Sequence, residues 1–111
     1  LQEKNIKYGI ANQIFAHSYI NSQVIIGDNN IINTGAIIEH EAIVGNHNHI
    51  SIGAKICGRS TIGNKCLIGA GSVIVDKLSI CDNVIIGAGA VVVRDINDAG
   101  TYVGNPVKRI K

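Results

Sequence analysis

The sequence predicts an all-β protein, a parallel β-helix built from hexapeptide repeats. An aliphatic residue returns at every sixth position from Ile14 to Val92, fourteen times in succession. Neither an α-helix, with a period of 3.6, nor an alternating strand, with a period of 2, keeps a strict period of six. A short strand plus a turn does so when each unit forms one side of a prism and points its aliphatic residue at the axis.

A second period, three times as long as the hexapeptide, indicates that three sides close one coil. Two sets of glycines recur at every third repeat: Gly35, Gly53, Gly71 and Gly89, and Gly27, Gly45 and Gly63. The residue four positions after each repeat aliphatic is usually Ala, Ser or Cys, which suits a second inward position at a crowded corner. Hexapeptide prisms wind to the left, against the usual preference of parallel crossovers. We therefore expect a left-handed parallel β-helix of four to five coils.

Residues 1–13 carry no aliphatic repeat, and we expect them to be a linker or the end of a missing N-terminal domain. The stretch LQEKNIKY resembles the end of a helix. The chain also opens without Met, which suggests a fragment or a processed form. The β-helix domain is then expected to cover residues 14–93.

Within residues 14–93 the repeats form three sets of sides. One set has polar turns and an outward column made of Ile31, His49, Leu67 and Ile85. A second set has small turns that contain Gly35 and its repeats, and the third includes the segment IEHEAI. Because an apolar outer face on a solenoid indicates contact with another subunit, the first set predicts an oligomer.

Residues 94–111 depart from the repeat. They contain a polar stretch, a Tyr-Val pair, a Gly-Asn-Pro turn and a basic end. The last coil of a β-helix otherwise exposes unpaired backbone groups, so we expect this segment to be a short C-terminal cap.

Composition narrows the function classes. The formal net charge is only +2, and no basic run is interleaved with aromatic residues, so nucleic-acid binding is not expected. No apolar window approaches the length of a membrane-spanning helix and no signal-peptide pattern opens the chain, so we expect no membrane association and a cytoplasmic location. Cys57, Cys66 and Cys81 are odd in number and lack CxxC spacing, which favours small core residues over a zinc site or a disulfide framework.

His40 is the strongest candidate for chemistry. It lies at the turn of IEHEAI, where side chains point outward, and Glu41 follows it directly. An exposed imidazole oriented by a carboxylate suits a general base working near neutral pH. Gly58 occupies the same position one coil further on, and its backbone N–H could stabilise an oxyanion. A histidine on a turn is by itself more often simply solvated, so this assignment depends on the fold.

His49 is a polar residue in an otherwise apolar outward column. It needs a hydrogen-bond partner, which we expect from a neighbouring chain or from a ligand. An interface histidine with a structural role fits equally well. His47 and His17 are given no role, since His47 belongs to a column of polar turn residues.

Several motifs together carry a resemblance to a known family. They are NTGAIIEHEAIVGNHNHIS, with a second His nine residues after that of IEHE, and the later segments IGAGSVI, IGAGAVVVRDI and YVGNPVKRI. From about residue 14 to residue 111, the chain resembles the left-handed β-helix acyltransferases. Within them it is most similar to the sialic acid O-acetyltransferase and UDP-amino-sugar N-acetyltransferase group. Members of that group normally have a Rossmann-like domain before the β-helix.

The resemblance implies a homotrimer that binds acetyl-CoA as cosubstrate between adjacent prisms and acetylates an amine or hydroxyl of a nucleotide-linked amino sugar or a sialic acid. It implies that His40 is the general base, that Glu41 orients it, and that the Gly58 amide contacts the thioester oxygen. Asn33 would place the acceptor, and His49 would contact acetyl-CoA or the acceptor. The remaining cofactor contacts would be Gly71, Gly89, Gly104, Lys108 and Arg109.

Two alternatives stay open. The first is a non-catalytic β-helix that serves as a trimerisation module or is an isolated fragment. The second is a zinc enzyme similar to the γ-class carbonic anhydrases, which hold the metal between prisms of this kind. That resemblance predicts two histidines five residues apart, whereas His40, His47 and His49 are spaced by seven and two. No metal is therefore expected.

Overall fold

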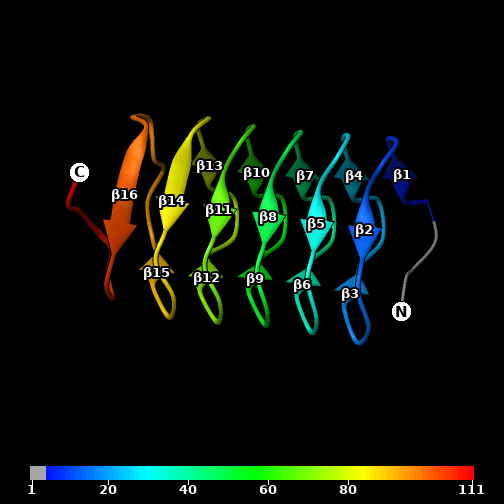
Figure 1. The fold of residues 1–111 in the computed structure, drawn as a ribbon, viewed down its shortest axis with the longest axis horizontal. Coiled ribbons are helices and arrows are strands. Elements are labelled where there is room, and N and C mark those ends of the chain that lie inside the picture. Colours follow the sequence, from blue (N-terminus) through cyan, green and yellow to red (C-terminus); the bar gives the residue numbers. More distant parts are fainter. Residues whose placement is uncertain (1–4) are drawn as a thin grey trace.

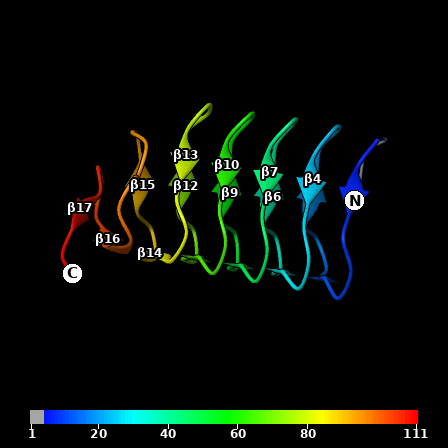
Figure 2. The same cartoon turned by 90° about the horizontal axis from the view of Figure 1, so that it is seen from above.

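The structure, a computed structural model, describes residues 5–111, and the regular structure in this range consists of β-strands. Strands β1 to β15 wind about a common axis as three parallel sheets, which form the sides of a prism (Figures 1 and 2). None of the described residues lies in a helix that could span a lipid bilayer.

Each sheet collects every third strand. Sheet A contains β3 (Tyr19–Ile20), β6 (Ile37–Ile38), β9 (Lys55–Ile56), β12 (Val73–Ile74) and β15 (Val91–Val92). Sheet B contains β1 (Lys7–Tyr8), β4 (Ile25–Ile26), β7 (Ile43–Val44), β10 (Thr61–Ile62) and β13 (Ser79–Ile80). Sheet C contains β2 (Gln13–Ile14), β5 (Ile31–Ile32), β8 (His49–Ile50), β11 (Leu67–Ile68), β14 (Val84–Ile86), β16 (Gly100–Val103) and β17 (Lys108–Arg109).

Paired residues in consecutive coils are three repeats apart, as in Ile25 with Ile43 and Ile38 with Ile56. With five strands in each of sheets A and B, the described chain makes about five coils. The predicted parallel β-helix is therefore confirmed. The outward column of sheet C is also confirmed, since His49 pairs with Ile31 on one side and with Leu67 on the other.

The core is the stack of inward residues along the axis. The repeat aliphatics from Ile20 to Val92 are at most 2% exposed, while Ile14 in the first coil is only partly buried. The predicted second inward position is confirmed by Ala36, Ala54 and Ser72, which are fully buried. Small side chains fit there because two sheets meet at the corner.

Three asparagines, Asn12, Asn30 and Asn48, share that corner position in successive coils and form a ladder. Asn48 is 2% exposed; its Nδ2 donates to the Gly63 carbonyl and its Oδ1 accepts from the Cys66 N–H, both at 2.8 Å. Its own N–H donates to Asn30 Oδ1 at 2.9 Å. The ladder thus pairs buried backbone groups at a corner where the strands have ended.

The first coil begins earlier than the repeat predicted. β1 pairs with β4, and the Gly9 N–H donates to the Ile26 carbonyl at 2.8 Å. Residues 7–13 are therefore part of the solenoid rather than a linker or a helix end, while residues 1–4 of that expected segment lie outside the described residues. Tyr8 occupies the repeat position one hexapeptide before Ile14, and an aromatic side chain there hid the pattern.

Residues 94–111 lie at the C-terminal end of the prism (Figure 1). Ile96 is 5% exposed and bridges to Ile80. β16 continues sheet C beside β14, but Val84 pairs with Gly100, where the regular repeat would place Tyr102. β17 then folds back antiparallel to β16. The segment thus pairs with the edge of the last coil of sheet C.

Candidate active site

His40 lies at the A–B corner, the turn that joins each strand of sheet A to the next strand of sheet B. The second residue of these turns forms a column along the prism: Ser22, His40, Gly58, Asp76 and Arg94. The third residue forms a second column with positive φ angles of 60–63°: Gln23, Glu41, Arg59 and Lys77. The two columns place chemically different side chains one coil apart along an exposed edge.

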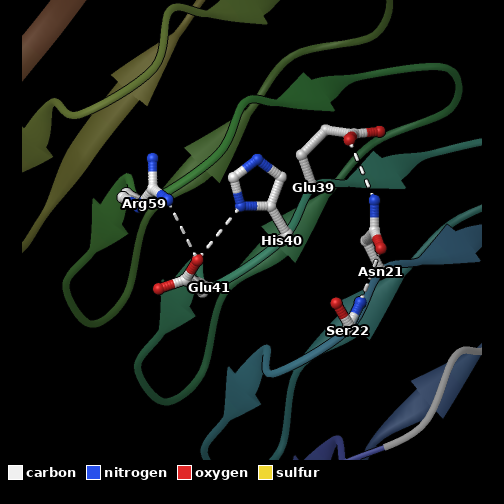
Figure 3. A network of polar contacts seen from close by, with 6 residues as sticks. All are labelled: Asn21, Ser22, Glu39, His40, Glu41 and Arg59. Atoms are coloured by element: carbon white, nitrogen blue, oxygen red, sulfur yellow. Dashed lines mark hydrogen bonds and ion pairs between the residues drawn. The ribbon is translucent and has the colours of Figure 1, made fainter.

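The imidazole of His40 is held by its sequence neighbour. Nδ1 lies 3.3 Å from Oε1 of Glu41, and the two side chains are 43% and 42% exposed (Figure 3). A carboxylate accepts a hydrogen bond, so this contact favours the tautomer with the proton on Nδ1 and a lone pair on Nε2. The pair can therefore present a basic nitrogen to a molecule in solvent.

Gly58 lies directly against the His40 ring. A Cβ at position 58 would be 2.9 Å from Nε2 and 3.0 Å from Cε1 of His40, so any larger residue would displace the ring. The Gly58 N–H has no hydrogen-bond acceptor within residues 5–111. The same is true of most residues at the second position of these turns. The sequence-predicted trio of His40, Glu41 and Gly58 is thus brought together, and a free N–H lies beside the imidazole.

Arg59 also belongs to this cluster, although sequence reasoning missed it. Its Nη2 lies 3.2 Å from Oε1 of Glu41, the oxygen that also contacts His40 (Figure 3). A signal was present, because Arg59 lies one coil after Glu41 in the same column, and such residues stack. The same rule applies to Asn21 and Glu39, whose side chains bond at 3.1 Å.

Cys57 lies near the carboxylates of Asp76 and Glu39, and its thiol is not activated. Burial raises the pKa of Cys57, and those two carboxylates raise it further. A raised pKa keeps the thiol protonated at neutral pH, and the thiolate is the nucleophilic form. The raised pKa of Cys57 therefore gives no support to a covalent intermediate on its thiol. The described chain contains free cysteines at 57, 66 and 81.

Asn33 and His49 form a second cluster, away from His40. Nδ2 of Asn33 lies 3.3 Å from Nε2 of His49, so the partner predicted from a neighbouring chain or a ligand is supplied by the same chain. His49 is on sheet C, whereas His40 is at the corner between the other two sheets. One chain therefore does not bring the two predicted halves of the site together. His47 bonds to Asn29 at 2.9 Å in an exposed turn, consistent with no further role.

The C–A corner, which joins sheet C to sheet A, is lined by glycine. Gly35, Gly53, Gly71 and Gly89 have φ angles of 66–69°, and a Cβ on any of them would meet no described atom within 4 Å. Positive φ alone does not require glycine here, because His17 holds a φ of 61° in the same column. We interpret the glycines as leaving room for a molecule outside the chain.

An open pocket of about 300 Å³ lies at the C-terminal end of the A–B corner. Its lining includes Arg94, Tyr102 and Arg109. Arg109 donates from Nε to the Lys111 carbonyl at 2.7 Å and from Nη2 to the Ala99 carbonyl at 2.8 Å, so it also fastens the tail. Lys108 and Gly104 are exposed on the same segment. Among residues 5–111 no three His, Cys, Asp or Glu side chains are grouped as metal ligands.

Two solved structures share this architecture. The acetyltransferase domain of PglB from Neisseria gonorrhoeae FA1090, in complex with acetyl coenzyme A, is 31% identical over 98% of this chain and 53% of that chain, with a TM-score of 0.96. A histidine-to-alanine variant of GDP-perosamine N-acetyltransferase from Caulobacter crescentus, in complex with CoA and GDP-perosamine, is 30% identical over 100% of this chain and 53% of that chain, with a TM-score of 0.98.

The family described as "Bacterial transferase hexapeptide (six repeats)" matches residues 60–94. The two solved relatives are left-handed β-helix acyltransferases, and mirror-image coils would not superpose at these TM-scores. The chain has the fold of a left-handed β-helix built from hexapeptide repeats. This hexapeptide β-helix spans about half the length of these two solved relatives. No curated protein matches its sequence.

The fold extends to more distant proteins. AntD, an N-acyltransferase from Bacillus cereus, in a variant bound to dTDP and coenzyme A, is 20% identical over 97% of this chain and 73% of that chain, with a TM-score of 0.81. At this identity the likeness shows the fold alone. The hexapeptide β-helix is thus compatible with low sequence identity, since the repeat constrains only the inward and turn positions.

Proposed function

We propose that the hexapeptide β-helix is the acetyl-transfer part of an acetyl-CoA-dependent sugar acetyltransferase. The observation that carries the proposal is the His40 imidazole, held by Glu41 against Gly58 at an exposed corner. The two solved relatives support it, because their structures contain acetyl-CoA, or CoA with the nucleotide sugar GDP-perosamine. The acceptor is the amine or hydroxyl of a nucleotide-linked amino sugar or of a sialic acid. Since acetyl-CoA and such sugars are cytoplasmic metabolites, we place the protein in the cytoplasm.

In the proposed reaction the acceptor attacks the acetyl carbonyl directly. Nε2 of His40 takes the proton from the attacking nitrogen or oxygen as the new bond to carbon forms. The Gly58 N–H stabilises the oxyanion of the tetrahedral intermediate. The C–S bond then breaks, and CoA leaves with that proton as the free thiol. No acetyl-enzyme is needed, in agreement with the protonated state of the Cys57 thiol.

We propose that the working unit is a homotrimer with sites between prisms. Ile85 of sheet C is 44% exposed, and Ile25 and Ile43 on sheet B are each 42% exposed, which leaves apolar surface for partner chains. A site between chains would also bring together residues that lie apart within one chain. His40 from the A–B corner of one subunit would face Asn33 and His49 of the next, so that Asn33 places the acceptor and His49 contacts acetyl-CoA or the acceptor.

We propose that acetyl-CoA lies along the A–B corner, with its thioester at His40 and its nucleotide toward the C-terminal pocket. Arg94 is three coils after His40 in the same column, a rise of about 14 Å at about 4.8 Å per coil. Lys108 and Arg109 near that pocket would contact phosphates. Gly104 in the tail, and Gly71 and Gly89 from the C–A corner of the neighbouring subunit, would line the pantetheine path.

The binding half of the proposal is tested by calorimetric titration of acetyl-CoA into the purified chain, with the mass in solution measured alongside. We expect about one molecule bound per subunit of a trimer. A panel of nucleotide amino sugars and sialic acids, assayed for released thiol, then identifies the acceptor. A folded trimer that binds no acetyl-CoA would contradict the proposal and favour a non-catalytic trimerisation module.

The catalytic half is tested by His40→Ala, with His47→Ala as the matched control at an exposed turn. We expect His40→Ala to lower turnover by about 10²-fold or more, the scale of a lost general base, with the trimer intact. His47→Ala should keep wild-type turnover, because His47 is exposed at a different turn, where its side chain bonds to Asn29. Wild-type turnover in His40→Ala would remove His40 from the mechanism.

A further inference from the structure

We infer that Arg59 is a positioning residue for the general base, acting through Glu41. This inference rests on the proposed acetyl transfer and adds a third member to the His40–Glu41 pair. Among the described residues Arg59 makes no hydrogen bond or ion pair with the imidazole, and we assign it no contact with the substrates. Its role is to hold the Glu41 carboxylate so that Oε1 faces Nδ1 of His40.

One oxygen joins the three side chains. Oε1 of Glu41 lies 3.3 Å from Nδ1 of His40 and 3.2 Å from Nη2 of Arg59 (Figure 3). The Arg59 backbone N–H also donates to the His40 carbonyl at 3.0 Å. Arg59 therefore contacts both members of the pair, His40 through its main chain and Glu41 through its side chain.

The backbone at this corner supports the same arrangement. Glu41 and Arg59 have φ angles of 63° and 60°, a region that residues with a Cβ seldom occupy. The C–A corner uses glycine for the equivalent turn residue in four successive coils. At the A–B corner the chain instead keeps two long charged side chains there, stacked one coil apart. Gln23 and Lys77 hold similar φ angles in this column, so the turn geometry is regular and stacks the oppositely charged Glu41 and Arg59 one coil apart.

The contact matters because Glu41 is exposed. A carboxylate that is 42% exposed can rotate into solvent and release the imidazole. A second donor on the same oxygen restricts that rotation, and the planar guanidinium holds its donors in a fixed geometry. Since Arg59 itself is 53% exposed, solvent screens the ion pair, and the effect on the rate should be modest rather than complete.

The test compares Arg59→Ala and Arg59→Lys with Lys65→Ala. Lys65 is an exposed cation at the equivalent position of a turn between sheets B and C, with a φ of 58°, so its removal controls for the loss of a charge from a turn of this geometry. We expect Arg59→Ala to lower kcat about threefold to fivefold, the scale of an exposed ion pair, with KM for acetyl-CoA and for the sugar unchanged. Arg59→Lys should restore part of kcat, and Lys65→Ala should match the wild type.

A double-variant cycle shows whether the effect passes through Glu41. In a Glu41→Ala background, Arg59→Ala should cause no further loss of kcat. An equal loss in both backgrounds would overturn the inference. So would a raised KM with unchanged kcat, because Arg59 would then bind a substrate directly.

A readout without substrate separates this inference from the proposed function. ¹⁵N NMR of the His40 ring, recorded where the ring is neutral, reports which nitrogen carries the proton. Glu41 favours the Nδ1–H tautomer, so Arg59→Ala should increase the share of Nε2–H, and Lys65→Ala should not. If this shift occurs but no sugar is acetylated, the positioning role stands and the proposed function fails. An unchanged tautomer ratio in Arg59→Ala overturns the positioning role, whatever the activity.

Discussion

At the scale of single residues, the candidate site depends as much on an absent side chain as on those present. The His40 ring lies so close to position 58 that a Cβ there would be only 2.9 Å from Nε2. The φ angle of Gly58 is not positive, so its backbone is open to other residues, and the lack of a Cβ is the property that matters. The Gly58 N–H and the imidazole therefore lie side by side because position 58 has no side chain.

Gly58→Ala should fold but lose activity. The added methyl contacts the end of a flexible side chain, so the imidazole can move aside at small cost to stability. A displacement of about 1 Å in a catalytic group lowers turnover by about 10²-fold, and we expect a loss on that scale. Circular-dichroism melting should match the wild type while acetyl transfer falls. Full activity in a folded Gly58→Ala would show that the ring position is not critical.

At the scale of elements, the corners add to the register that the two-residue strands set. Each strand contributes few ladder bonds, and the turns supply further backbone bonds between coils, such as that from the Arg59 N–H to the His40 carbonyl at 3.0 Å. Side chains at the corners add to these backbone bonds. The asparagine ladder does this at the B–C corner, which joins sheet B to sheet C. The ladder ends at Cys66, whose thiol is a weak donor and lies 3.1 Å from the Cys81 carbonyl oxygen.

Asn48→Ala should destabilise the fold by about 2–4 kcal/mol. It leaves the Cys66 N–H and the Gly63 carbonyl without their side-chain partners and opens a cavity at a site that is 2% exposed. Cys66→Ala, one rung further, removes only a weak donor and should cost about 1 kcal/mol or less. Urea unfolding at one protein concentration measures both, since the stability of an oligomer depends on concentration. Equal losses would mean that the ladder contributes little.

At the scale of the whole molecule, the prism separates residues that the proposed reaction needs together. His40 lies at the A–B corner, and His49 lies on sheet C, across the prism. The prism is about 20 Å wide, with principal extents of 37 × 21 × 20 Å. No change of side-chain rotamer joins the two within one chain. A shared site therefore requires two chains.

Mixed oligomers test this directly. His40→Ala and His49→Ala should each be impaired alone, but trimers assembled from equal amounts of both should regain about a quarter of the wild-type sites. This is the random chance that one interface joins an intact His40 to an intact His49. Native mass spectrometry confirms mixing before the assay. Verified mixed trimers without recovered activity would mean that the two residues do not share a site.

The sequence by itself determined the architecture and the centre of the candidate site. The strict period of six predicts which side chains point inward. The period three times as long predicts which residues stack in successive coils, because every coil has the same length. His40, Glu41 and Gly58 were found in this way, two by adjacency and one by stacking. The Arg59 contact with Glu41 was equally accessible from the period, since the two residues lie one coil apart.

Only the tertiary structure decided the features that depart from the period. The first coil at Lys7 was hidden by Tyr8, and the tail pairs with β14 out of step with the regular repeat. Asn33 bonds to His49 rather than to a residue of its own column, a contact set by side-chain rotamers. The backbone repeat determines the position of each Cβ atom. Packing at the ends of the prism and hydrogen bonds at the surface determine the conformation of the side chain. For that reason the coil and the cluster around His40 could be predicted from the sequence, whereas the first coil, the pairing of the tail and the Asn33–His49 bond could not.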